Sequence, residues 1–306
     1  METGIVYTTI GGGLNSRGQE RSRATVQDYH QKPLPIMRNK TTHRVDIIGL
    51  KKVEQRTAVT FNGHEYESMY TIGMEVEKNQ LAARSLREYE LFCGFERDGS
   101  CGYEAVTHIL PLLPKGSWRT KVFDMMHKAE KIIDDRWSRS DGRNHSGNFN
   151  CGGHITIGVK GMSGAEIRDA IRKHCGIIYS IFRKRLKNTY CQYNNRMQSS
   201  YDCLSWHDKY QVALVKGDVL EFRLVSKFES VKQMMRRYEL FYEVLNFAIT
   251  NPNGTHAQLM KVIKPIVLSM YEGNVEKAER VIELSKHFQA FIDSGDVHDD
   301  IRQFIR

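Results

Sequence analysis

The sequence predicts an α+β fold, in which an antiparallel sheet built from hairpins has flanking helices and a helical C-terminal tail. Two observations carry this prediction. Short alternating stretches are joined by tight-turn signals, which is typical of hairpins. Longer stretches with apolar residues at helical spacing lie between the hairpins and after them. The chain has 306 residues, enough to bury a sizeable core without disulfides.

The first strands form a hairpin. Residues 57–61 (Thr-Ala-Val-Thr-Phe) and 64–69 flank Asn62-Gly63, a pair that suits the positive φ angles of a two-residue turn. A further strand is expected over Tyr70 to Glu77. Its residues alternate between two faces, because successive side chains of a strand point in opposite directions.

The middle of the chain mixes helices and one more strand. Apolar residues at helical spacing predict a helix from Trp118 to Trp137. The polar segment 141–150 is expected to be a mobile loop, and alternation predicts a strand over 153–159. Ser163 and Glu166 form a capping box, which opens a helix that we expect to continue to residue 181.

The last part begins with a second hairpin and continues as helices. Strands are expected over 210–215 and 219–225, closed by Lys216-Gly217-Asp218. Helices are expected over about 231–248, 256–271 and 275–292. We therefore divide the chain into three parts: a basic, loosely structured N-terminal arm (1–55), a central domain (56–250), and a C-terminal helical region (251–306) that packs on it.

Bulk properties limit the classes of function. The net charge is +9, which could attract nucleic acid or another anion, but the charge is not gathered in one block. The six cysteines are scattered without a CxxC pair, so we expect reduced thiols rather than a cysteine zinc site. No apolar run approaches the ~18 residues of a membrane span, and residues 1–15 do not resemble a signal peptide. We expect a cytoplasmic protein without a membrane partner.

Three strands carry the residues that could do chemistry. Glu75 and Glu77 share one face of their strand, His154 follows two glycines onto the polar face of the next, and Glu221 and Arg223 share a face of a third. By themselves, alternating charged residues are common in exposed strands, and a single histidine is commonly a hydrogen-bonded structural residue. Together they would place three carboxylates, a histidine and an arginine on one sheet face. Oxygen ligands favour Mg²⁺ or Mn²⁺, and the histidine tilts the choice toward Mn²⁺.

The order of these motifs resembles the amidoligase family, which belongs to the carboxylate–amine ligase superfamily with glutamine synthetase and glutamate–cysteine ligase. The motifs are Gly73–Glu77, Asp98-Gly99-Ser100 before Glu104–Thr107, Gly153–Ile157 and Leu220–Arg223. The resemblance covers roughly residues 68–248 and implies a glutamine-synthetase-like sheet in an amidoligase-like catalytic domain. It also implies formation of an amide or isopeptide bond from ATP, a carboxylate and an amine through an acyl phosphate.

The resemblance assigns roles to individual residues. It implies two or more Mg²⁺ or Mn²⁺ ions, with Asp98 as a weaker further ligand. The implied metal ligands are Glu75, Glu77, Glu104, His154 and Glu221. Arg223 and, by a looser match, Arg196 would contact phosphate in catalysis, and Lys209 would join them in binding the nucleotide. Substrates would be a carboxylate and an amine on small molecules, peptides or proteins.

Two departures from the family keep alternatives open. Relatives commonly have a second histidine where this chain has Thr156, and a proline where it has His108. One alternative is therefore a non-catalytic relative that acts in interaction or assembly. Another is a nucleic-acid-binding protein, which the positive charge favours but the acidic strand faces do not explain. A metal-dependent nuclease fits the strands less well. The sequence also allows a homo-oligomer, with nucleic acid as a secondary partner.

Overall fold

The computed structural model describes about three fifths of the chain. The residues described are 7–8, 25–26, 58–61, 64–78, 89–96, 103–134, 151–188, 191, 212–294 and 304–305. The expected 141–150 loop and Trp137 lie outside them, as does most of the N-terminal arm. Of that arm, β1 (Tyr7–Thr8) pairs antiparallel with β2 (Thr25–Val26).

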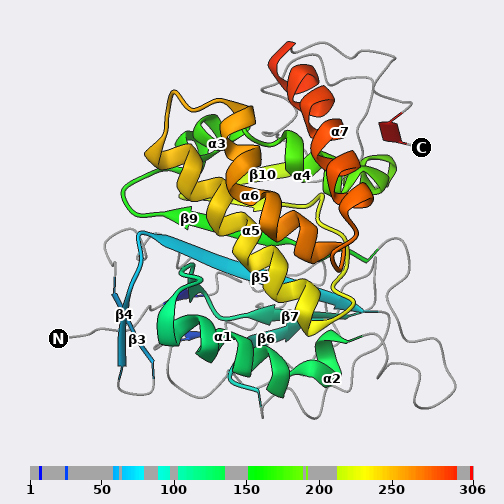
Figure 1. The fold of residues 1–306 in the computed structure, drawn as a ribbon. Coiled ribbons are helices and arrows are strands. Elements are labelled where there is room, and N and C mark those ends of the chain that lie inside the picture. The colour runs from blue at the N-terminus through cyan, green and yellow to red at the C-terminus, as the bar shows by residue number, and fades with distance from the viewer. Residues whose placement is uncertain are drawn as a thin grey trace, which may run out of the picture.

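Within the described residues, seven strands form one sheet in which every neighbouring pair is antiparallel (Figure 1). Across the sheet their order is β10 (Ala213–Lys216), β11 (Val219–Phe222), β9 (Ile155–Val159), β5 (Tyr70–Lys78), β7 (Tyr103–Thr107) and β6 (Phe92–Glu96), and β8 (Leu110–Pro111) pairs with β5. Antiparallel strands with separate helices confirm the predicted α+β class.

Both expected hairpins are present. Strands β3 (Ala58–Phe61) and β4 (His64–Glu67) pair so that only two residues separate them, in a small sheet of their own. Strands β10 and β11 are joined at Gly217 and Asp218, with Lys216 opposite Val219. Gly217 has a φ of 61°, which glycine adopts without a steric penalty at the first central position of such a turn.

Helices cover one side of the sheet and continue to the C-terminus. They are α1 (Gly116–Lys128), α2 (Glu130–Ile133), α3 (Gly164–Arg172), α4 (Gly176–Ile181), the 3₁₀-helix η4 (Arg183–Lys187), α5 (Val231–Thr250), α6 (His256–Met270) and α7 (Val275–Ser294). The capping box of Ser163 and Glu166 begins α3 as expected, and the three C-terminal helices match their predicted positions.

Two expected helices are each broken in two. The first is interrupted at Ala129, between α1 and α2, and the second at residues 173–175, between α3 and α4. The second break lets α4 pack against α7 (Figure 1). A Cβ added to Gly176 would lie 2.3 Å from the carbonyl oxygen of Ser285 and 2.7 Å from the amide nitrogen of Gln289. Apolar periodicity does not reveal such a close helix contact.

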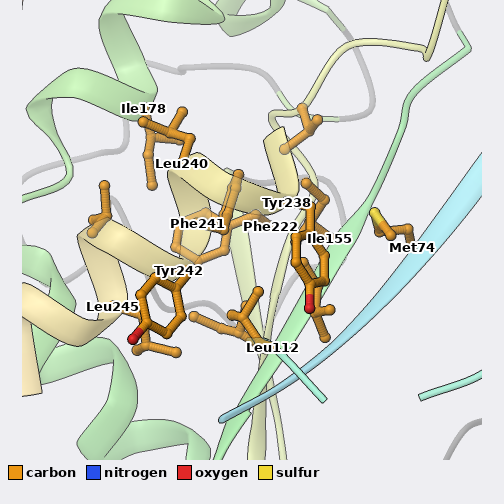
Figure 2. Packing of buried hydrophobic residues seen from close by; sticks show 14 of the residues in the cluster. Met74, Leu112, Ile155, Ile178, Phe222, Tyr238, Leu240, Phe241, Tyr242 and Leu245 are labelled. Carbon is orange, nitrogen blue, oxygen red and sulfur yellow. The ribbon is translucent and has the colours of Figure 1, made fainter. Parts of the chain in front are cut away.

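The sheet has an apolar face and a polar face. On the apolar face, Met74, Ile155 and Phe222 are fully buried, and Figure 2 shows them beside Tyr238 and Phe241 of α5. The rings of Phe222 and Phe241 meet edge to face, with centroids 5.2 Å apart. Buried residues of α6 and α7 belong to the same hydrophobic cluster. This packing fixes which side of each strand carries the polar residues.

Strands β6, β7 and β8 were not predicted. Gly94 and the irregular register between Phe92 and Gly94 obscure the alternation of β6, so pattern reading does not find it.

The helices that the structure describes include none with the length and apolar content that crossing a membrane requires.

Candidate metal centre

The central strand β5 and the residues just before β9 form the candidate site. Residues 73, 75 and 77 of β5 lie on the polar face, opposite to the core residues Met74 and Val76. The amide of Glu75 donates to the carbonyl oxygen of His154 at 3.0 Å, which extends the pairing of β5 with β9 by one residue. His154 therefore stands directly opposite Glu75 on the same face.

The imidazole of His154 lies between two carboxylates. Its Nδ1 is 2.6 Å from Oε2 of Glu75, and its Nε2 is 3.3 Å from Oε1 of Glu77. One ligand atom from each of the three residues lies within 4.8 Å of the other two. The three residues are 4–8% exposed, so water does little to weaken the repulsion between the carboxylates.

This donor set suits a divalent cation. When both ring nitrogens face carboxylate oxygens, the three groups are joined either by a second proton, on the ring or on a carboxyl group, or by a metal ion. Two carboxylates with one imidazole are ligands that Mn²⁺ accepts readily and Mg²⁺ accepts less well. The residues present thus fit the expected ion, and a purely structural hydrogen-bonded group is the competing interpretation.

The glycines before His154 organise this site. The amide of Gly152 donates to Oε2 of Glu77 at 2.5 Å, which leaves Oε1 directed at His154. A Cβ on Gly152 would lie 3.0 Å from Nε2 of His154 and 3.1 Å from Nη2 of Arg185, and one on Gly153 would lie 2.5 Å from the carbonyl oxygen of Ser226. The glycines therefore make room for neighbouring protein groups.

Glu104 lies on the far side of β5 from His154. It faces Glu77 in the register of β5 with β7 and is 3% exposed. Although it is not one of the three residues in the tight group, it extends the acidic row across the sheet. The register of β6 with β7 places Glu96 opposite Glu104. The pattern of the sequence does not reveal this register, because the alternation of β6 is irregular near Gly94.

Glu221 shares the polar face but stands apart from the three-residue group. It lies opposite Thr156 of β9, which lies opposite Gly73 of β5, so two strand spacings, about 10 Å, separate it from β5. Its side chain is fully buried. Oε1 accepts a hydrogen bond from Nη1 of Arg223 at 2.6 Å, and Oε2 contacts Nζ of Lys216. In this structure two cations neutralise Glu221.

Cys191 lies near both parts of the polar face. Burial raises the pKa of its thiol to about 11, and the charges of Arg185 and Arg223 oppose that rise while Glu77 adds to it. Its Sγ donates to the carbonyl oxygen of Arg185 at 3.1 Å. The thiol therefore lies within the electrostatic influence of Glu77, from the three-residue group, and of Arg223, the partner of Glu221.

Arg185 lies at this site, although no pattern in the sequence points to it. Its Nη1 donates to the carbonyl oxygen of Cys151 at 3.0 Å, and the side chain is 4% exposed. It belongs to the run Arg183-Lys184-Arg185, which looks like a solvated surface in the sequence. Three expected residues, Asp98, Arg196 and Lys209, lie outside the described residues.

His108, at the position where amidoligases commonly have a proline, is part of the interior. It is 1% exposed, and burial lowers its pKa to about 3. Its amide donates to the carbonyl oxygen of Leu91 at 2.9 Å. His108 is therefore neutral at physiological pH and adds no charge to the site.

Comparisons with known proteins do not identify a family. No protein-family model matches the sequence, and a search of curated proteins finds no significant match. Among solved structures, one described as "Apo GmaS without ligand" is similar over 83% of this chain and 74% of that chain, with 8% sequence identity and a TM-score of 0.33. A similarity at this level does not establish a shared fold or activity.

Proposed function

We propose that the protein is an ATP-dependent carboxylate–amine ligase that uses Mg²⁺ or Mn²⁺ and forms an acyl phosphate. The observation that carries the proposal is the buried group of Glu75, Glu77 and His154, whose ligand atoms lie within 4.8 Å of one another. This group lies on the same sheet face as Glu104 and Glu221. The order of these residues in the sequence supports the proposal independently, through the resemblance to the amidoligases.

Each residue has a role in this proposal. Glu75, Glu77 and His154 hold one ion, with Glu104 and Glu221 as ligands toward further ions. Such ions would supply positive charge against the phosphates of ATP. Arg223 is the cation on this face best placed to meet a phosphate oxygen, because its guanidinium already binds the carboxylate of Glu221. Arg196 and Lys209 remain predicted nucleotide contacts.

The chemistry demands alignment more than acid–base catalysis. A substrate carboxylate attacks the γ-phosphorus of ATP, ADP leaves, and an amine then displaces phosphate from the acyl phosphate. Burial of the polar face excludes the water that would otherwise hydrolyse such an intermediate. The described residues therefore bind and orient phosphate and carboxylate groups, and none of them is assigned as the group that removes the amine proton.

Two observations favour a non-catalytic relative as the second candidate. Glu221 is already neutralised by Lys216 and Arg223, and Thr156 occupies the position of a histidine that relatives commonly have. A protein with these features could retain the packing of the fold and one ion without turning over ATP. Its function would then be interaction or assembly.

The test is ATP hydrolysis that depends on a carboxylate and an amine. ADP is measured with the full chain, Mg²⁺ or Mn²⁺, and pools of amino acids. Glu75→Gln and Glu221→Gln are expected to lower the rate at least ~100-fold, because each removes a charge that stabilises the transferring phosphate. Glu283→Gln, on the exposed surface of α7, is the matched control. No turnover with any pool, together with equal nucleotide binding by all four proteins, would leave the non-catalytic candidate.

A further inference from the structure

A cavity of about 450 Å³ lies between the end of α4, η4 and the first turns of α7, helices that pack side by side in Figure 1. Its described lining has apolar, polar and basic parts but no acidic residue. The lining residues are Ile181, Phe182, Arg183, Lys184, Arg185, Ser226, Tyr271, Lys277, Arg280 and Val281. The volume is in the range of small-molecule sites.

Most of the basic residues in this lining lack carboxylate partners. In the part of the chain that the structure describes, no carboxylate lies within ion-pair distance of Arg183, Lys184, Lys277 or Arg280. Other cations of the same C-terminal helices do have partners there: Lys264 with Glu279, Lys286 with Glu283, and Lys232 with Glu272. Like charges around one cavity repel each other unless an anion lies among them.

Further positive charge lies behind the cavity floor. The guanidinium of Arg237 is 2% exposed and lies between the rings of Phe182 and Phe228, at 5.1 and 4.8 Å. Its Nη2 donates to Oγ of Ser226 at 2.8 Å, and Ser226 lines the cavity. Burial lowers the pKa of Arg237 to about 9, so it still carries its charge at neutral pH.

Two more features favour an anion. Burial raises the pKa of the Tyr271 phenol, and the charges of Arg183 and Arg237 oppose that rise, so the phenol lies in the field of both guanidinium groups. Lys277 is in the first turn of α7, where the helix dipole gives the helix start a partial positive charge. A hydroxyl, guanidinium groups and ammonium groups are the usual partners of phosphate oxygens.

We propose that this cavity binds a small molecule that carries a diphosphate or triphosphate group. The four cations for which the described residues offer no carboxylate partner exceed what a single carboxylate needs, and they match the two to four charges of a phosphate chain. The apolar wall of Ile181, Phe182 and Val281 gives a ligand a non-polar surface beside its phosphates. Inorganic pyrophosphate and the phosphate chain of a nucleotide share this chemistry.

The cavity adjoins the metal cluster through Arg185. This residue lines the cavity, donates to the carbonyl oxygen of Cys151, and approaches the same side of Gly152 as His154 does. A phosphate chain in the cavity would therefore lie one side chain away from the cluster. The proposal does not depend on ligase activity, because the basic side chains that line the cavity supply the positive charge without a metal ion.

The experiment is titration calorimetry of the full chain with pyrophosphate in EDTA. Lys277→Gln and Arg280→Gln each remove one charge from the exposed start of α7 and replace it with a good helix former, so both variants should fold. Each is expected to weaken binding about tenfold or more, the effect of one charge-assisted hydrogen bond. Lys128→Gln, which removes a charge from the exposed end of α1, is expected to bind as the wild type does.

The controls separate this site from the metal cluster. Glu75→Gln should bind pyrophosphate normally in EDTA, even if ATP turnover is absent from every variant. If ATP competes with pyrophosphate and the binding of ATP weakens in the same variants, the ligand is a nucleotide. If pyrophosphate binds and ATP does not compete with it, the ligand is another phosphate compound.

Three results would overturn the proposal. The first is that the wild type does not bind pyrophosphate. The second is that Lys277→Gln and Arg280→Gln bind it as tightly as the wild type does. The third is that Lys128→Gln loses as much affinity as those two variants. An RNA oligonucleotide that binds more tightly than pyrophosphate and weakens in the same two variants would instead assign these residues to nucleic acid.

Discussion

Replacing Glu75 by glutamine should remove stabilisation by metal while leaving the metal-free protein intact. Without an ion, two carboxylates flank the single imidazole of His154. Glu75→Gln removes one of the two negative charges and keeps a hydrogen-bonding group of the same size, and Glu77 still faces the ring. Because no buried charge loses its only partner, we expect the stability in EDTA to change by about 1 kcal/mol or less.

The wild type and Glu75→Gln should differ in how much stability they gain from metal. At an Mn²⁺ concentration 100 times the dissociation constant, the wild type gains about 2.7 kcal/mol of stability. For 306 residues, an unfolding entropy of about 2.1 cal/mol/K per residue converts this gain to a rise of about 4 °C in Tm. If the loss of one of three ligands weakens binding ~100-fold, Glu75→Gln gains only about 0.4 kcal/mol, which is less than 1 °C.

Differential scanning calorimetry in EDTA, Mg²⁺ and Mn²⁺ measures both effects. Glu283→Gln on α7 serves as the control, because its ion pair with Lys286 is exposed. Equal Mn²⁺-induced shifts in the wild type and Glu75→Gln would refute a metal site at these residues. An absence of any shift in the wild type would leave Glu75, Glu77 and His154 as a hydrogen-bonded structural group without a metal ion.

Three further predictions concern the interior. The pKa values of His108 and His256 are lowered to about 3 and about 4, mainly by burial. Below pH 6.5 the unfolded chain therefore binds protons that the folded chain does not, and each histidine costs about 2 kcal/mol of stability at pH 5. Urea unfolding at pH 7 and 5 should show a loss that is about 2 kcal/mol smaller in His256→Gln. The thiol of Cys191, with a pKa of about 11, should react with iodoacetamide at pH 8 about 100-fold more slowly than a free cysteine until urea unfolds the chain, as peptide mass spectrometry can measure. Gly176→Ala should destabilise the protein by about 1–3 kcal/mol because its Cβ would overlap the α7 backbone, whereas Gly73→Ala, with its nearest neighbour at 4.0 Å, should cost less in the same urea assay.

Each of these predictions has a contrary result. An equal pH-dependent loss in the wild type and His256→Gln would mean that other groups set the acid sensitivity. Rapid labelling of Cys191 in the folded protein would place the thiol at the surface. Equal stability of the two alanine variants would show that α4 and α7 do not approach each other closely at Gly176.

Patterns in the sequence are sufficient for the parts of the fold that depend on local chemistry. The hairpin at Gly217 and the capping box at Ser163 were found because turns and caps demand particular residue types. The faces of β5 followed from strict alternation. Strand β6 was missed because its register is irregular near Gly94, and the α3–α4 break was missed because its cause, a contact with α7, lies more than 100 residues away in the sequence.

The candidate site was predictable to the same extent. Placing Glu75, Glu77 and His154 on one face required only strand periodicity and the assumption that their strands are neighbours. The separation of Glu221 from them could not be read from the sequence, because it depends on the strand order β11-β9-β5. Arg185 was not recognised either, since its role arises from packing against the residues before His154.

The position of Glu221 determines what a ligase mechanism would require of this chain. Its two oxygens are held by Lys216 and Arg223, so it cannot bind an ion in the same geometry without giving up at least one of these cations. A cation released from Glu221 would still lie on the polar face, where it could meet a phosphate oxygen. Metal binding at Glu221 and phosphate binding by Arg223 would then favour each other, because a ligand that supplies one new partner offsets the loss of the other. A non-catalytic relative has no need for this exchange, and its ion pairs at Glu221 would persist when nucleotide and metal are added.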